Sequence, residues 1–137
     1  MIKATELQLG DYVLVEGKIR RVESLTKRKI GFHINDEKKR LYYARLCEVE
    51  PIEINEYVFR ISGFCVENQG TVFLADFKCD EFEIFVIPNS LGQGEYEYIL
   101  KVHANAMCNY VDMYNLRFVH ELQHAVRLCG VNFEVKL

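Results

Sequence analysis

The strongest constraint on the fold of this 137-residue chain is the close spacing of turn signals in its first fifty residues. Gly10 and Asp11 introduce an apolar run, and Glu16-Gly17 can form a tight turn between this run and the next. The predicted strands in this half cover residues 12–15, 19–25, 30–34 and 41–49. Because short, strongly curved strands at this density are typical of small barrels, residues 1–50 predict an SH3-like β-barrel subdomain.

The chain changes character near Pro51, and residues 51–137 predict an α+β subdomain. A short helix is expected between Asn55, an acceptable N-cap, and Gly63, a helix-ending residue. Its predicted apolar face comprises Tyr57, Val58 and Ile61. Strand signals follow at residues 65–67, 71–77, 82–87 and 96–102, with weaker ones at 107–113 and 131–137. These runs predict an antiparallel β-meander with one partly solvated face and a turn at 88–94.

A second short helix, amphipathic and close to the C-terminus, is predicted over about residues 116–129, with Asn115 as its N-cap and Gly130 at its end. At about 100° per residue, one stripe of this helix is apolar and is expected to pack on the core. The stripe comprises Phe118, Val119, Leu122, Ala125, Val126 and Cys129. The opposite, outward face carries Arg117, His120, His124 and Arg127.

Residues 120–124 of this helix read His-Glu-Leu-Gln-His, which matches the H-E-x-x-H pattern of zinc peptidases. In such a site His120 and His124 would share a zinc ion, and Glu121 would act as general base toward metal-bound water. The two arginines on the same face have permanent positive charges that would repel a dication. The pattern therefore supplies a testable metal pair in an unfavourable electrostatic setting.

The number of ligands also weighs against zinc, because a catalytic zinc ion normally has three protein ligands. The thirteen residues after His124 contain no histidine, and Arg127 and Gly130 occupy the positions of the glycine and third histidine of the extended motif. The upstream candidates for a third ligand are His33, His103 and Cys108. We therefore favour a structural helix that closes the core, with a zinc-dependent hydrolase as the alternative.

Composition excludes several classes of protein. Half of the residues are apolar, so the chain can bury a core, and no segment approaches the roughly 18 apolar residues of a membrane span. The first residues lack an apolar signal-peptide core, and the five cysteines are scattered without a C-x-x-C pair. We therefore expect a cytoplasmic protein with reduced, mostly buried thiols and without a cofactor or a membrane partner.

Charge is distributed unevenly along the chain. Residues 1–50 hold eleven Lys and Arg against eight Asp and Glu, whereas residues 51–137 hold six against twelve. Six basic residues could form one interaction surface if the first two hairpins pair as predicted: Lys18, Arg20, Arg21, Lys27, Arg28 and Lys29. Such a surface could bind nucleic acid, or it could be a solvated strand edge that discourages aggregation, and we favour the edge.

Three stretches carry a resemblance to a known group of sequences. They are M-I-K-A-T-E-L-x-L-G-D-Y-V at residues 1–13, P-I-x-I-x-E at 51–56, and the F-V-H-x-L-Q helix that ends in glycine at 118–130. These stretches resemble an uncharacterised family of short proteins from Bacteroides-type bacteria and their mobile elements. In similar proteins the second histidine of the motif is often an amide residue, which suits a structural helix. The family has no established activity, so the resemblance implies fold and context alone.

Together these observations predict a non-enzymatic binding or accessory module, which the resemblance implies is encoded by a mobile element. The expected partner is a protein. Nucleic acid is a weaker candidate, because the acidic half of the chain would oppose it.

Overall fold

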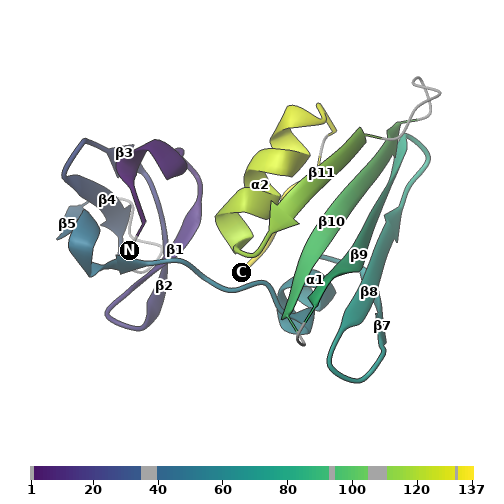
Figure 1. Ribbon diagram of the computed structural model, residues 1–137. Coiled ribbons are helices and arrows are strands. Elements are labelled where there is room, and N and C mark those ends of the chain that lie inside the picture. The colour runs from purple at the N-terminus through teal and green to yellow at the C-terminus, as the bar shows by residue number, and fades with distance from the viewer. Residues whose placement is uncertain (1, 35–39, 93–94, 105–110, 132) are drawn as a thin grey trace. The chain divides into compact units, whose positions relative to one another are not determined.

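The computed structural model describes residues 2–34, 40–92, 95–104, 111–131 and 133–137. The chain forms two compact units (Figure 1). Unit 1 comprises Met1–Glu53 and Phe118–His120, and unit 2 comprises Ile54–Arg117 and Glu121–Leu137. The strands pair antiparallel throughout the described residues, which also contain two α-helices, so the fold is mixed α+β as predicted. Neither helix within the described ranges is long and apolar enough to cross a membrane.

Unit 1 contains six short strands in two sheets. The strands are β1 (Tyr12–Val15), β2 (Lys18–Arg21), β3 (Ser24–Leu25), β4 (Lys29–His33), β5 (Leu41–Arg45) and β6 (Val49–Glu50), with 3-10 helices η1 (Ala4–Glu6) and η2 (Leu46–Glu48). The sheet orders are β2-β1-β6 and β3-β4-β5, and the described strands form no closed barrel. The predicted tight turn joins β1 to β2, and its residues Glu16 and Gly17 both have positive φ, as a two-residue hairpin turn of this kind requires.

The predicted strand 19–25 is divided because the chain passes from one sheet to the other within it. Val22 still pairs with the first sheet, since its N–H donates to the Asp11 carbonyl at 2.8 Å. The next residue, Glu23, donates instead to the Gly31 carbonyl of β4. Val22 is fully buried, and the core receives side chains from both sheets. This core comprises Ile2, Leu7, Val13, Val15, Val22, Ile30, Phe32, Ala44 and Val49.

Unit 2 is built on one five-stranded antiparallel meander, as the strand signals predicted (Figure 1). Its order is β11-β10-β9-β8-β7, from strands β7 (Cys65–Asn68), β8 (Phe73–Lys78), β9 (Phe82–Gly92), β10 (Glu95–Ala104) and β11 (Val111–Leu116). The helices are α1 (Glu56–Ile61) and α2 (Val119–Leu128), and the first two residues of α2 belong to unit 1. Alternate residues of the central strands are buried, so one face of the sheet packs on a core.

Helix α1 begins and ends where the sequence predicted, although its buried face differs. The Asn55 side chain caps the helix by accepting a hydrogen bond from the Val58 N–H at 3.2 Å. Gly63 follows the helix with φ of 91°, a conformation that glycine adopts without strain. Tyr57 was wrongly assigned to the apolar face, since it is 65% exposed, and Phe59 is fully buried instead.

Aromatic rings fill the core of unit 2, and Phe59 is one of them. Its ring meets Phe64 edge to face at 5.0 Å and lies 5.3 Å from Phe73, both measured between ring centroids. Phe73 also stacks on Tyr98 at 4.6 Å, and burial raises the pKa of Tyr98. Phe133 completes the cluster against Phe64 at 5.3 Å. Phe59 is therefore a fully buried member of the aromatic core.

Three predicted boundaries in this half are wrong. The segment predicted as a turn at 88–94 includes Pro88, which lies inside β9 opposite Tyr98. Strand β8 pairs only with residues 83–86 of β9, so Pro88 has a strand neighbour on one side and its missing N–H is tolerated. Asn115 lies in β11, and the helix begins at Val119. The described residues of the predicted strand 131–137 are irregular. The Lys136 backbone N–H donates to Ser62 Oγ at 2.9 Å, and the Val135 side chain is buried.

Candidate functional site

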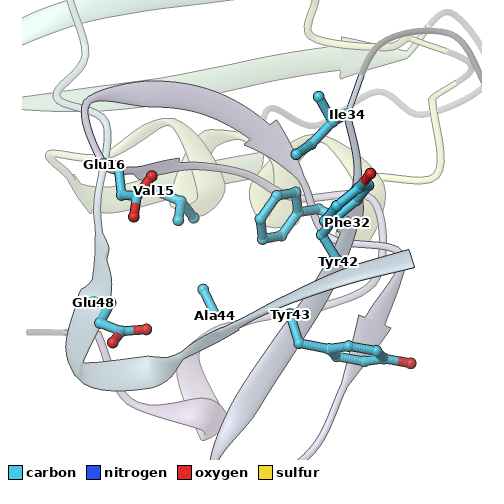
Figure 2. Close-up of a pocket in the computed structure, with 8 residues that line it drawn as sticks. All are labelled: Val15, Glu16, Phe32, Ile34, Tyr42, Tyr43, Ala44 and Glu48. Atoms are coloured by element: carbon cyan, nitrogen blue, oxygen red, sulfur yellow. The ribbon is translucent and has the colours of Figure 1, made fainter. Parts of the chain in front are cut away.

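The described residues contain a pocket of about 320 Å³ in unit 1 (Figure 2). It is lined by Val15, Glu16, Phe32, Ile34, Tyr42, Tyr43, Ala44 and Glu48. The lining combines aromatic and aliphatic side chains with two carboxylates, which is typical of sites that bind an apolar group and orient it by a few polar contacts. None of these residues belongs to unit 2, so the pocket is a property of unit 1 alone.

Pairing between β4 and β5 sets the walls of this pocket. Phe32 lies opposite Tyr42, and side chains of such a cross-strand pair share one face of the sheet. Tyr43, the next residue, therefore starts from the other face and borders the pocket at its rim. Figure 2 shows the Tyr43 ring pointing away from the other labelled side chains. Tyr42 and Tyr43 are 38% and 54% exposed, so both rings are accessible to a ligand.

The two carboxylates come from the turns beside the strands. Glu16 is the first residue of the β1–β2 turn, and Glu48 ends η2. The Glu48 Oε2 atom accepts a hydrogen bond from the Arg45 backbone N–H at 2.8 Å, which fixes the side chain. In Figure 2 both carboxylates lie across the pocket from Phe32 and Tyr42. The pocket therefore has an aromatic wall and an acidic wall.

A basic side chain lies over each aromatic ring of the pocket. The Arg20 guanidinium lies 5.4 Å from the Phe32 ring centroid, and the Arg40 guanidinium lies 5.3 Å from that of Tyr42. The Lys29 ammonium lies 4.5 Å from the Tyr43 ring centroid. At these distances the cations are attracted by the ring faces. The aromatic wall is therefore bordered by positive charge, opposite the acidic wall.

The six basic residues expected to form one surface are distributed over two sheets. Lys18, Arg20 and Arg21 lie on β2, where successive side chains alternate between faces. The other three occur together, because Lys27 and Arg28 form the turn before β4 and Lys29 is its first residue. Thr26 closes this turn, with its N–H donating to the Lys29 carbonyl at 2.9 Å and its hydroxyl accepting from the N–H groups of the following residues.

Register adds a basic residue that the sequence reading missed. Arg45 lies directly opposite Lys29 in the β4–β5 pair, and the Leu46 N–H donates to the Arg28 carbonyl at 3.0 Å. The turn and the end of β5 are therefore adjacent. Arg45 lies within the strand predicted at 41–49. Pairing that strand with the one predicted at 30–34 in the observed register would have placed Arg45 beside Lys29.

The histidine motif lies in the first turns of α2, and its glutamate stabilises the start of the helix. Glu121 Oε2 accepts a hydrogen bond from the Arg117 backbone N–H at 2.8 Å. The N–H of Val119, the first helical residue, donates to the Ile52 carbonyl at 2.9 Å. Both bonds satisfy backbone donors at the start of the helix, a position where such groups have no partner within the helix.

The expected outward position of His120 is wrong, because only 4% of its surface is exposed. Its ring stacks on Phe118, with centroids 5.8 Å apart and planes 8° from parallel. His124 is half-buried and Arg127 is exposed. The predicted apolar stripe is buried at four of its six positions, Val119, Leu122, Ala125 and Val126, while Phe118 and Cys129 are half-buried.

The described parts of the chain contain no group of three His, Cys, Asp or Glu side chains placed to hold a metal ion. Of the upstream candidates for a third ligand, His33 donates from Nδ1 to the Arg40 carbonyl at 2.9 Å. His103 lies on β10 opposite Glu83. Cys108 lies outside the described residues.

The cysteines differ from the expectation of burial. Cys47, Cys65, Cys79 and Cys129 are free thiols, and the first two are exposed while the others are half-buried. Burial raises the pKa of the Cys129 thiol. The reactivity of the four thiols is therefore expected to differ.

No protein-family model, no curated protein and no solved structure matches this chain.

Proposed function

We propose that this protein is a non-enzymatic binding or accessory module that holds a segment of a partner protein in the pocket of unit 1. The observation that carries the proposal is the pocket itself, of about 320 Å³, with buried Phe32 and exposed Tyr42 on one wall and carboxylates on the other. An apolar side chain of the partner would pack on Phe32 and Tyr42. Glu16 and Glu48 would accept hydrogen bonds from N–H groups of the bound segment.

Unit 1 as a whole supports this role. We regard it as a small SH3-like barrel, because two three-stranded sheets enclose one core and the chain passes directly from one sheet to the other between Val22 and Glu23. A rigid core of this kind holds the pocket walls in fixed positions before the partner arrives, which lowers the entropy cost of binding. The resemblance to proteins of Bacteroides-type mobile elements suits a cytoplasmic accessory protein.

The non-enzymatic part of the proposal takes support from the histidine motif. Glu121 is bound to the Arg117 N–H and His120 is buried against Phe118, so both residues have structural partners. A zinc hydrolase would need Glu121 turned toward a metal-bound water.

The proposal is tested with a random peptide library displayed on phage and selected on the full-length protein. We expect enriched peptides whose affinity for Tyr42→Ala is at least tenfold weaker, about 1.4 kcal/mol, because this variant removes part of the aromatic wall. The matched control is Tyr57→Ala, which removes an exposed tyrosine from α1 and should leave binding within twofold. Failure to enrich any peptide would refute the proposal, and so would peptides that bind Tyr42→Ala as well as the parent protein.

A further inference from the structure

Four basic residues and an exposed tyrosine lie near one end of the β3-β4-β5 sheet. The basic residues are Lys27, Arg28, Lys29 and Arg45, and we call them with Tyr43 the basic end. Cross-strand pairing places Lys29 opposite Arg45, and Gly31 opposite Tyr43, on one face of the sheet. The hydrogen bond from the Leu46 N–H to the Arg28 carbonyl holds the turn against this end.

The positive charge of the basic end is not neutralised within the described residues. None of its four cations forms an ion pair there. The nearby Glu48 carboxylate accepts its hydrogen bond from the Arg45 backbone N–H and not from a basic side chain. Like charges directly opposite each other on paired strands are destabilising, as Lys29 and Arg45 are here. A bound anion would relieve that repulsion.

Tyr43 adds an aromatic platform to this charge. Its ring crosses Gly31, since a Cβ atom built on that glycine would lie 3.0 Å from Tyr43 Cε1. The absence of a side chain at Gly31 therefore gives the ring its place on the sheet, where it remains 54% exposed. The Lys29 ammonium lies 4.5 Å from the ring centroid, on a long side chain that can move aside.

We propose that the basic end binds single-stranded nucleic acid, with a base stacked on Tyr43 and backbone phosphates on the four cations. Proteins that bind single strands without sequence preference combine positive charge along the backbone with aromatic side chains on which bases stack. A stacked base would displace the Lys29 ammonium, which then pairs with a phosphate. An acidic peptide offers charge without a planar base, and a duplex keeps its bases enclosed, so a single strand fits both features of the surface.

This surface goes beyond the proposed protein-binding pocket. None of the four cations lines the pocket, and Tyr43 borders it at the rim only. Substitution of Lys29 and Arg45 therefore leaves the pocket walls at Phe32 and Tyr42 in place. Loss of one activity is separable from loss of the other.

The test is fluorescence anisotropy of a labelled oligo-dT twelve-mer with the full chain at two salt concentrations. Four phosphate contacts predict a log-log salt slope of about −2.8, or roughly fiftyfold weaker binding at 200 mM than at 50 mM salt. We expect Lys29→Gln/Arg45→Gln to weaken binding at least tenfold at 50 mM and to halve the slope. The matched control, Lys18→Gln/Arg21→Gln, removes the same charge from β2 and should change affinity no more than twofold.

Tyr43 distinguishes a single-strand site from a general polyanion surface. Tyr43→Ala should weaken dT binding at least fivefold without changing the salt slope, and Tyr43→Phe, which keeps the ring, should restore it. The proposal is overturned if the dT oligomer does not bind at 50 mM salt or if the β2 control weakens binding as much as the Lys29/Arg45 pair. It is also overturned if heparin or a twelve-base-pair duplex binds as tightly as dT and Tyr43→Ala has no effect.

Discussion

Replacing Glu121 separates a structural role from a catalytic role for the histidine motif. The carboxylate accepts a hydrogen bond from the Arg117 N–H at 2.8 Å, in the first turn of α2 where the helix dipole favours negative charge. Glu121→Ala removes both interactions. Glu121→Gln keeps an acceptor oxygen and removes only the charge. A structural role therefore predicts a graded loss of stability, whereas a catalytic base would be lost equally in both variants.

The size of the effect follows from the two interactions. Loss of a side-chain cap costs about 0.5–2 kcal/mol, and loss of the charge at the helix start costs about 0.3–1 kcal/mol. The hydrogen bond is exposed, so water replaces part of it, and we expect about 1–1.5 kcal/mol for Glu121→Ala and about 0.5 kcal/mol for Glu121→Gln. For a chain of 137 residues, the alanine variant should melt roughly 3–5 °C lower.

Scanning calorimetry measures both variants, with Glu81→Ala as the matched control because Glu81 is an exposed residue in the segment between β8 and β9. The control should stay within about 0.5 kcal/mol of the parent protein. The reasoning is refuted if Glu121→Ala is as stable as the parent. Stoichiometric zinc in untagged protein that is lost in His124→Ala would instead support the hydrolase alternative.

Three further outcomes are expected. Phe59→Ala should lower the free energy of unfolding by about 4 kcal/mol in urea titrations, because the fully buried ring contacts two others, and a loss under about 2 kcal/mol would contradict that burial. Gly63→Ala should cost about 1 kcal/mol from its positive φ alone, since the nearest atom to a new Cβ is 3.7 Å away; unchanged urea stability would be inconsistent with that φ. Iodoacetamide at pH 8 should modify Cys129 more slowly than Cys65, as followed by mass spectrometry, because burial raises the pKa of Cys129 and leaves less thiolate. Because the pKa of Cys129 is higher in the folded than in the unfolded chain, the folded state favours the neutral thiol. The free energy of unfolding that this thiol contributes is therefore fully present below pH 9, and it is lost as pH rises through the pKa of the folded state.

The sequence predicted elements whose signal lies within a few residues. Asn55 and Gly63 bound α1 because a helix start needs a side-chain acceptor and a helix end tolerates a left-handed residue. Glu16-Gly17 gave the first hairpin because a two-residue turn needs positive φ. In each case the residue type meets a requirement of its own backbone, so no distant partner has to be known.

Features set by distant partners were not predictable in this way. Pro88 was assigned to a turn, but a proline is tolerated in a strand where no neighbouring strand needs its N–H, and the pairing of β9 with β8 stops at Val86. Arg45 was missed in the basic group because its position depends on the register with Lys29. Both outcomes depend on which strands pair and how far, which the spacing of apolar residues does not specify.

The burial of His120 shows the same limit on a helix. Helical periodicity gives the direction of each side chain relative to the apolar stripe. It does not say how many of the neighbouring side chains are also buried by other segments. Here residues 52–54 pair with residues 117–119, through the Val119 N–H to Ile52 carbonyl bond, and this brings a second segment against the first turn of α2. More of the helix surface is therefore buried at its start than the apolar stripe alone, and less is buried toward exposed Arg127. The first half of the histidine motif lies in this more buried part of the helix, where His120 stacks on Phe118 and Glu121 binds the Arg117 N–H. Substitution of Glu121 is therefore expected to change the stability of the helix.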